Sequence, residues 1–213
     1  MKTNTRYRFY REHKFITQKL AELDALIAKT DFRVLPNVET IKENLADLTE
    51  MLMGHAFFEN SCIHPLLKSK NSNFYEKIEM EHQHHEKDLN SFREQLESIL
   101  DSTAPVTREN AGYTFYLNFR LFFSENLKHL HEEETIVMAE LQRLYSDDEL
   151  RLIEFNTFKQ MSPEDMTHMI DALTPYINPS DRAFFLNEMN TAEPKKFIES
   201  GLTLSEDNNL TNA

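Results

Sequence analysis

Residues 109–145 read ENAGYTFYLNFRLFFSENLKHLHEEETIVMAELQRLY, and this stretch determines the predicted fold class. Its apolar side chains recur every three or four residues, which is the period of an α-helix with one buried face. Towards its end the same face also carries polar side chains. In order, the face consists of Phe115, Phe119, Phe122, Asn126, His129, Glu133 and Ile136. The stretch therefore predicts a long helix whose buried face mixes phenylalanine with histidine and glutamate.

Three earlier stretches show the same helical period, and short polar turns separate them. The predicted helices are residues 5–29, 38–67 and 74–100. Short connections make consecutive helices antiparallel, and the chain lacks the alternating Val, Ile and Thr runs that are typical of strands. We therefore predict an all-α fold in which residues 1–145 form an up-down-up-down four-helix bundle.

After Tyr145 the pattern changes to shorter helices whose first turns are marked by capping residues. Ser146, Ser162-Pro163 and Asn178-Pro179 are typical of helix starts. We expect residues 146–213 to form a helical C-terminal extension that packs on the bundle. Its tail, from Thr203 to Ala213, has little to bury and is expected to be frayed.

Composition excludes several classes of function. The chain has 36 acidic and 23 basic side chains and a net charge of −13, which disfavours binding to nucleic acids or to anionic membranes. No apolar run approaches the roughly 18 residues that a membrane helix needs. The single cysteine, Cys62, excludes an intrachain disulfide. Together with an N-terminus that lacks the apolar segment of a secretion signal, it favours the cytoplasm.

Each of the four predicted helices carries histidine on its apolar face. These histidines are His13, His55, His82 with His85, and His129. A glutamate follows one turn later on the second and fourth helices, at Glu59 and Glu133, and such a pair directs both side chains at one place. Counting from the helix ends puts His13, His82 and both pairs in one slab, roughly 12–18 Å from the same end of the bundle. Because a buried imidazole or carboxylate without a partner is costly, the pattern predicts a metal site.

The types of ligand narrow the choice of metal. Imidazole together with carboxylate suits iron, manganese or zinc, and two carboxylates surrounded by four or more imidazoles favour a pair of irons. Glu59 and Glu133 are then the expected bridges, and a coordination position stays open for a small diatomic molecule such as O2. A ferritin-like site would need Glu-x-x-His on two helices. Here the spacing occurs on the third helix, as Glu79-x-x-His82, and has no partner on the fourth helix.

Five segments in this order resemble the hemerythrin-like, or HHE cation-binding, family. They are Arg11-Glu12-His13-Lys14, His55 to Asn60, His64-Pro65, Glu81-His82 and His129 to Glu134. The resemblance implies a four-helix bundle with a non-haem pair of irons, joined by an oxo or hydroxo bridge, that binds O2 or a related molecule. By the same resemblance, the expected ligands are His13, His55, Glu59, His82, His129 and Glu133.

One position departs from the family pattern. Oxygen-carrying hemerythrins have His-x-x-x-His on the third helix, whereas this chain has His82-x-x-x-Glu86, with His85 in between. We include Glu86 in the predicted ligand set and leave open whether Glu86 or His85 completes the site. Whether Glu133 or Glu134 bridges the two metal ions also stays open.

Other polar residues have supporting or structural interpretations. Glu12, Glu81 and Asn126 are candidates for accepting hydrogen bonds from the ligand histidines. His64 is expected to be structural, and His84, His131 and His168 are expected to face solvent.

The leading hypothesis is a cytoplasmic non-haem di-iron protein that binds O2, NO or peroxide for sensing, storage or detoxification. Manganese or zinc are the alternative metals. One alternative function is a di-iron oxidase or peroxidase, because a carboxylate in place of an imidazole would favour oxidation over reversible binding. Another is an iron- or oxygen-responsive interaction module in which residues 146–213 contact a protein partner.

Overall fold

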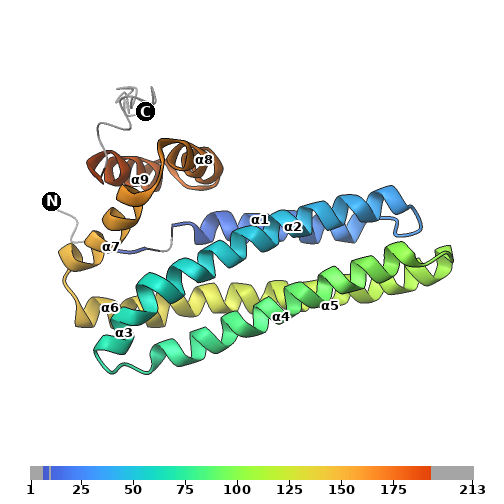
Figure 1. The fold of residues 1–213 in the computed structure, drawn as a ribbon, viewed down its shortest axis with the longest axis horizontal. Helices are drawn as coiled ribbons and strands as arrows, with labels where there is room; N and C mark the ends of the chain where they lie inside the picture. The colour runs from blue at the N-terminus through green and yellow to red at the C-terminus, as the bar shows by residue number, and fades with distance from the viewer. Residues whose placement is uncertain (1–6, 10, 193–213) are drawn as a thin grey trace, which may run out of the picture. The chain divides into compact units, whose positions relative to one another are not determined.

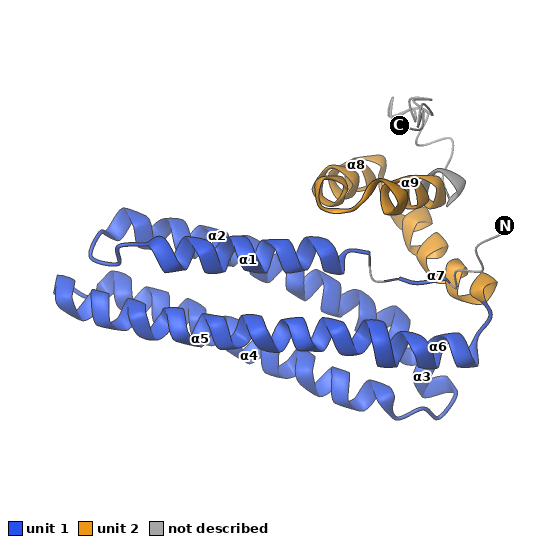
Figure 2. Ribbon diagram, turned by 180° about the vertical axis from the view of Figure 1, so that it is seen from behind, with its two compact units in different colours: residues 1–146 blue, residues 147–213 orange. Residues whose placement is uncertain are grey.

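The computed structural model describes residues 7–9 and 11–192, with side chains up to Glu188. It divides into two compact units, residues 1–146 and 147–213 (Figure 2). Within the described residues every regular element is a helix, which confirms the predicted all-α class. None of the helices described is both long enough and apolar enough to cross a membrane.

The first unit is built from four long helical segments that lie side by side (Figure 1). They begin with α1 His13–Lys29, α2 Leu35–Phe58, α4 Phe74–Asp101 and α5 Pro105–Glu132. The helix α2 continues without a break through η1 Glu59–Ile63 and α3 His64–Ser69. In the same way α5 continues through η2 Glu133–Val137 and α6 Met138–Leu144. Both α1 and α4 pack against α2 and α5, so the four segments enclose one interior.

Phenylalanine dominates the apolar part of this interior. Phe115, Phe119 and Phe122 have at most 1% of their surface exposed. The ring of Phe92 on α4 packs edge-on against Phe115 and Phe122, with centroid distances of 5.6 and 5.4 Å. Each fully buried ring contributes about 1.5–3 kcal/mol to folding. The predicted interior face of the fourth helix is therefore present as a dry aromatic wall.

The first helix begins later than its period predicts. Its predicted start at Thr5 lies outside the described residues, and residues 7–9 are not helical. Instead, the buried rings of Tyr7 and Phe9 pack edge-to-face with a centroid distance of 5.4 Å. The Tyr7 carbonyl also accepts a hydrogen bond from Gln142 Nε2 at 2.9 Å. These contacts hold the segment in a non-helical conformation, so α1 starts at His13.

The fourth segment begins earlier than predicted, at Pro105 rather than near Glu109. Proline fits the first turn of a helix because that turn needs no N–H bond from it. The helix start therefore falls within the turn predicted between residues 100 and 109.

Two π-helical turns, η1 and η2, interrupt the two longest helical segments. The α-helical period predicts that Cys62 and Ile136 lie on the buried face. Cys62 is only half-buried and Ile136 is 43% exposed, whereas the next residues, Ile63 and Val137, are buried. A π-helical turn bonds residue i to i+5 and takes more chain per turn. The buried face of each segment therefore shifts by one residue toward the C-terminus at its π-helical turn.

The second unit is helical as predicted. Its elements are α7 Asp147–Gln160, α8 Pro163–Leu173, η3 Thr174–Tyr176 and α9 Pro179–Ala192. The predicted cap at Ser162 is confirmed, because its hydroxyl accepts from the Asp165 backbone N–H at 3.1 Å in a capping box. Within the unit α7 packs against α9, and the rings of Phe158 and Phe185 meet edge-on at 6.0 Å. The tail from Thr203 to Ala213 lies outside the described residues.

Two helical glycines provide a matched test of the packing in the first unit. A Cβ at Gly112 would lie 2.1 Å from Cγ of the buried Phe32 ring, whereas a Cβ at Gly54 would meet nothing within 4 Å. Alanine improves helix propensity by about 1 kcal/mol at either position, but overpacking costs about 1–3 kcal/mol. We expect Gly54→Ala to raise the free energy of unfolding in urea and Gly112→Ala to lower it. Equal effects would contradict this packing.

Candidate metal centre

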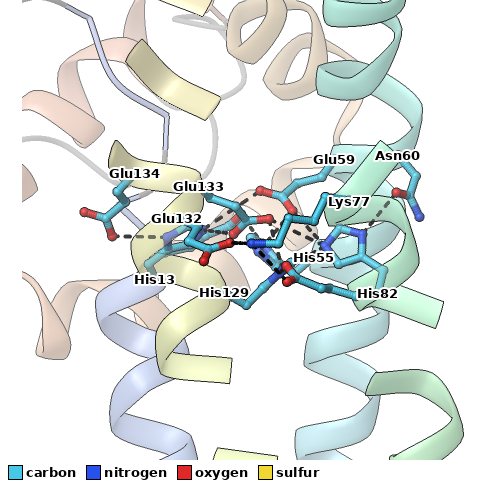
Figure 3. A network of polar contacts seen from close by, with 12 residues as sticks. His13, His55, Glu59, Asn60, Lys77, His82, His129, Glu132, Glu133 and Glu134 are labelled. Atoms are coloured by element: carbon cyan, nitrogen blue, oxygen red, sulfur yellow. Dashed lines mark hydrogen bonds and ion pairs between the residues drawn. The ribbon is translucent and has the colours of Figure 1, made fainter. Parts of the chain in front are cut away.

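Six side chains from the four long helical segments meet inside the first unit (Figure 3). Each is buried, with 8% or less of its surface exposed. They form two groups whose ligand atoms lie within 4.8 Å of one another. The first group is His13, His55, Glu59 and Glu133, and the second is Glu59, His82, His129 and Glu133. The two carboxylates belong to both groups, and each group adds its own pair of histidines.

The inner nitrogen of every histidine in the centre, Nε2, faces one of the two shared carboxylates. The nitrogen–oxygen distances are 3.5 Å from His13 to Glu133, 3.5 Å from His55 to Glu59, 3.2 Å from His82 to Glu59 and 3.1 Å from His129 to Glu133. Four imidazoles from four helices and two carboxylates from two π-helical turns therefore converge on one small volume.

The outer nitrogen of each ring, Nδ1, has an oxygen partner on a neighbouring residue. These pairs are His13 with Glu134 at 3.1 Å, His55 with Glu12 at 2.7 Å, His82 with Asn60 at 3.1 Å and His129 with Glu81 at 3.0 Å. Because carboxylate and amide oxygens accept hydrogen bonds, each Nδ1 carries the proton and donates it. In the neutral ring the Nε2 lone pair then points inward, which is the tautomer that a metal ion needs.

The side-chain nitrogens and oxygens that point into the centre are better placed to bind metal ions than to hydrogen-bond with one another. Among the described residues, both oxygens of Glu59 and of Glu133, together with Nε2 of His55, are buried without a well-directed hydrogen bond. The Nε2 atoms of His82 and His129 lie 3.0 Å apart, and two lone pairs can share that contact only through a proton. Unpaired buried carboxylates are costly. Cations between the imidazoles and the carboxylates would satisfy all of these atoms.

The pKa shifts of the buried groups also favour a cation in the centre. Burial alone would lower the pKa of His55, but the carboxylates of Glu59 and Glu12 outweigh it and raise this pKa to about 10. The same balance raises the pKa of His129 to about 9, with Glu133 as its main partner. Burial and the charge of Glu133 raise the pKa of Glu59. The two buried carboxylates therefore attract positive charge strongly.

Each π-helical turn places two neighbouring side chains so that both contact histidines of the centre. Glu59 and Glu133 are each the first residue of a π-helical turn. The residue that follows each glutamate, Asn60 or Glu134, accepts from the outer nitrogen of a histidine on another helix. Such turns are frequent at functional sites. Sequence reasoning missed the role of Asn60, although a polar acceptor follows the glutamate in both His-x-x-x-Glu pairs.

The structure separates the predicted alternatives at two positions. Glu133 lies in the centre, whereas Glu134 lies outside it with half of its side chain exposed. Glu86 is exposed and belongs to neither group, because the buried face of α4 passes through His82 and His85 instead. The predicted ligand Glu86 is thus not brought to the other six. The His85 ring lies edge-on to His129, with a centroid distance of 5.0 Å, and burial lowers the pKa of His85 to about 4.

Of the three residues predicted to accept hydrogen bonds from the histidines of the centre, two do so. Glu12 and Glu81 accept hydrogen bonds from His55 and His129 as predicted, whereas the Asn126 amide donates to the Phe122 carbonyl at 2.8 Å. His64 is buried with its ring stacked on His82. His84, His131 and His168 are exposed, as expected.

The fold and the site together define a helical protein with a buried histidine–carboxylate centre for cations. The model of the hemerythrin HHE cation binding domain matches residues 4–141, and the chain therefore belongs to this family. Comparison with curated proteins and with solved structures finds no match.

The outer hydrogen bonds can be tested without touching a ligand atom. Glu12→Gln removes the carboxylate that accepts from His55 Nδ1, and losses of this kind weaken metal binding by about 10–100-fold. The measurement is an anaerobic titration of the metal-stripped protein with Fe²⁺. Glu43→Gln, at an exposed position of α2, is the control and should bind as the wild type does. Identical affinities for the two variants would contradict the role of Glu12.

Proposed function

We propose that the protein holds two iron ions in this centre and binds O2 or a related small molecule, such as NO or peroxide, for sensing, storage or detoxification. The four long segments, in this proposal, form an up-down-up-down four-helix bundle around the irons. The observation that carries the proposal is the pair of shared carboxylates, each facing histidines from both groups. Two bridging carboxylates inside a helical bundle are typical of paired metal ions.

The composition of each group favours iron over zinc. Each group offers two imidazoles and shares both carboxylates. A structural zinc site is usually closed by four ligands of its own. Non-haem iron takes mixed histidine and carboxylate ligands and keeps positions open. When bound, a pair of ferrous ions supplies electrons and open coordination positions for a small oxidant.

The chain's own residues determine how such a pair would be held. The outer acceptors orient the four imidazoles, as described above, so that Nε2 faces inward. The rings of Phe122 and Phe119 line the interior beside His85 and the apolar core, where they exclude water. The unit is thus suited to admit a small neutral molecule and to exclude bulk solvent.

Metal content tests the proposal directly. We expect about two irons per chain by elemental analysis of protein loaded with Fe²⁺. His55→Ala should lose at least about one of them and unfold more readily, because metal binding energy is partly folding energy. His131→Ala changes an exposed ring and should keep both. One zinc ion per chain, or full iron content in His55→Ala, would contradict the proposed centre.

The fate of the reduced protein in O2 distinguishes binding from turnover. We expect a change in the absorption spectrum when O2 is added to the ferrous protein, and we expect removal of O2 to reverse it. The dry aromatic wall is the physical reason, since it keeps water and protons away from the bound molecule. Continuous O2 consumption with release of a reduced product would overturn this expectation and favour an oxidase.

A further inference from the structure

A small cavity lies beside the second pair of histidines, between α2, α4 and α5. Its walls include both His82 and His129 and, from the first pair, His55, so the cavity reaches three of the four histidines of the centre. Its volume is about 30 Å³, on a scale where one water molecule needs roughly 10–15 Å³. The cavity therefore has room for a molecule of two or three heavy atoms.

Besides histidines of the centre, the walls combine apolar surface with three polar side chains, of which Glu86 is exposed. Leu52, Leu89 and Leu130 supply buried aliphatic surface. His85 and Asn126 supply hydrogen-bonding groups, and both are buried. Small-ligand sites typically have this character, with an apolar lining and a few placed polar groups.

The two buried polar side chains, His85 and Asn126, are held in place by contacts that leave hydrogen-bonding capacity for a ligand. The His85 ring packs edge-on between His129, at a centroid distance of 5.0 Å, and Phe122, at 5.7 Å. The Asn126 Nδ2 donates one hydrogen to the Phe122 carbonyl at 2.8 Å, which orients the amide. Its second N–H and its carbonyl oxygen are not used in that bond.

We propose that this cavity is the binding site for the small ligand. The ligand lies on the His82 and His129 side of the centre, with His85 and Asn126 as its hydrogen-bonding partners. The inference rests on the proposed function, because the ligand needs the metal pair as its main anchor. The cavity adds the side from which the ligand binds and an upper limit on its size. His85 is thereby a binding residue for the ligand rather than a metal ligand.

The test uses azide, a linear ion of three heavy atoms, on the oxidised two-iron protein. Absorption titration measures the azide affinity, and elemental analysis of the same samples measures iron. Ala56 lines the cavity, so Ala56→Leu should fill it and weaken azide binding at least about tenfold while iron stays at the wild-type level. Ala46→Leu, at an exposed position of the same helix, makes the same change away from the cavity and should leave both measurements unaltered.

A second variant tests His85. We expect His85→Ala to keep its iron and to bind azide at least about fivefold more weakly, which corresponds to the loss of one hydrogen bond. Loss of iron from His85→Ala would make His85 a metal ligand and overturn the proposal.

Wild-type protein provides a test that needs no variant. Imidazole, with its five-membered ring, exceeds the cavity and should not compete with azide. Competition by imidazole would overturn the proposed size limit, as would unchanged azide affinity in Ala56→Leu with full iron. Either result leaves the di-iron function intact. A wild-type protein with two irons that responds to neither azide nor O2 would instead overturn the proposed function itself.

Discussion

Two carboxylates buried in an apolar helical interior are the constraint on which the rest of the structure depends. Moving a charged group out of water costs several kcal/mol even after the protein relaxes, and Glu59 and Glu133 are both almost completely buried. Only nearby positive charge can offset this cost. Four imidazoles face the two carboxylates, and their outer nitrogens are bonded to oxygens that keep the rings turned inward. The arrangement is stable only if protons or cations occupy the space between these groups.

The interior of the first unit has an apolar half and a polar half, and these two halves have opposite physical requirements. Phenylalanine and aliphatic side chains fill one half and provide the free energy that orders the helices. That order holds the polar half in a geometry it could not maintain alone. The cavity lies where the two halves meet, with leucines on one side and His82 and His129 on the other. A small molecule there would contact apolar walls and the centre together, as the proposed function requires.

Much of this could be predicted from the sequence. The period of residues 109–145 and its three counterparts predicts the long helices, and six of the seven histidines and glutamates predicted on their buried faces are the residues that the structure brings together. The seventh, His85, lies beside them. Helix ends were less predictable. The start of α1 depends on contacts of Tyr7 and Phe9 with distant residues, and periodicity contains no information about such contacts.

The sequence by itself determined the helical class and the composition of the centre, because period and residue type are local properties of the chain. Tertiary structure alone decided which of two neighbouring residues faces inward. Ile63 rather than Cys62, and Val137 rather than Ile136, are buried after the two π-helical turns. Neighbours on a helix differ by about 100° in direction. Packing between helices and the two π-helical turns set the final rotation of each segment, and these act only once all four segments are assembled.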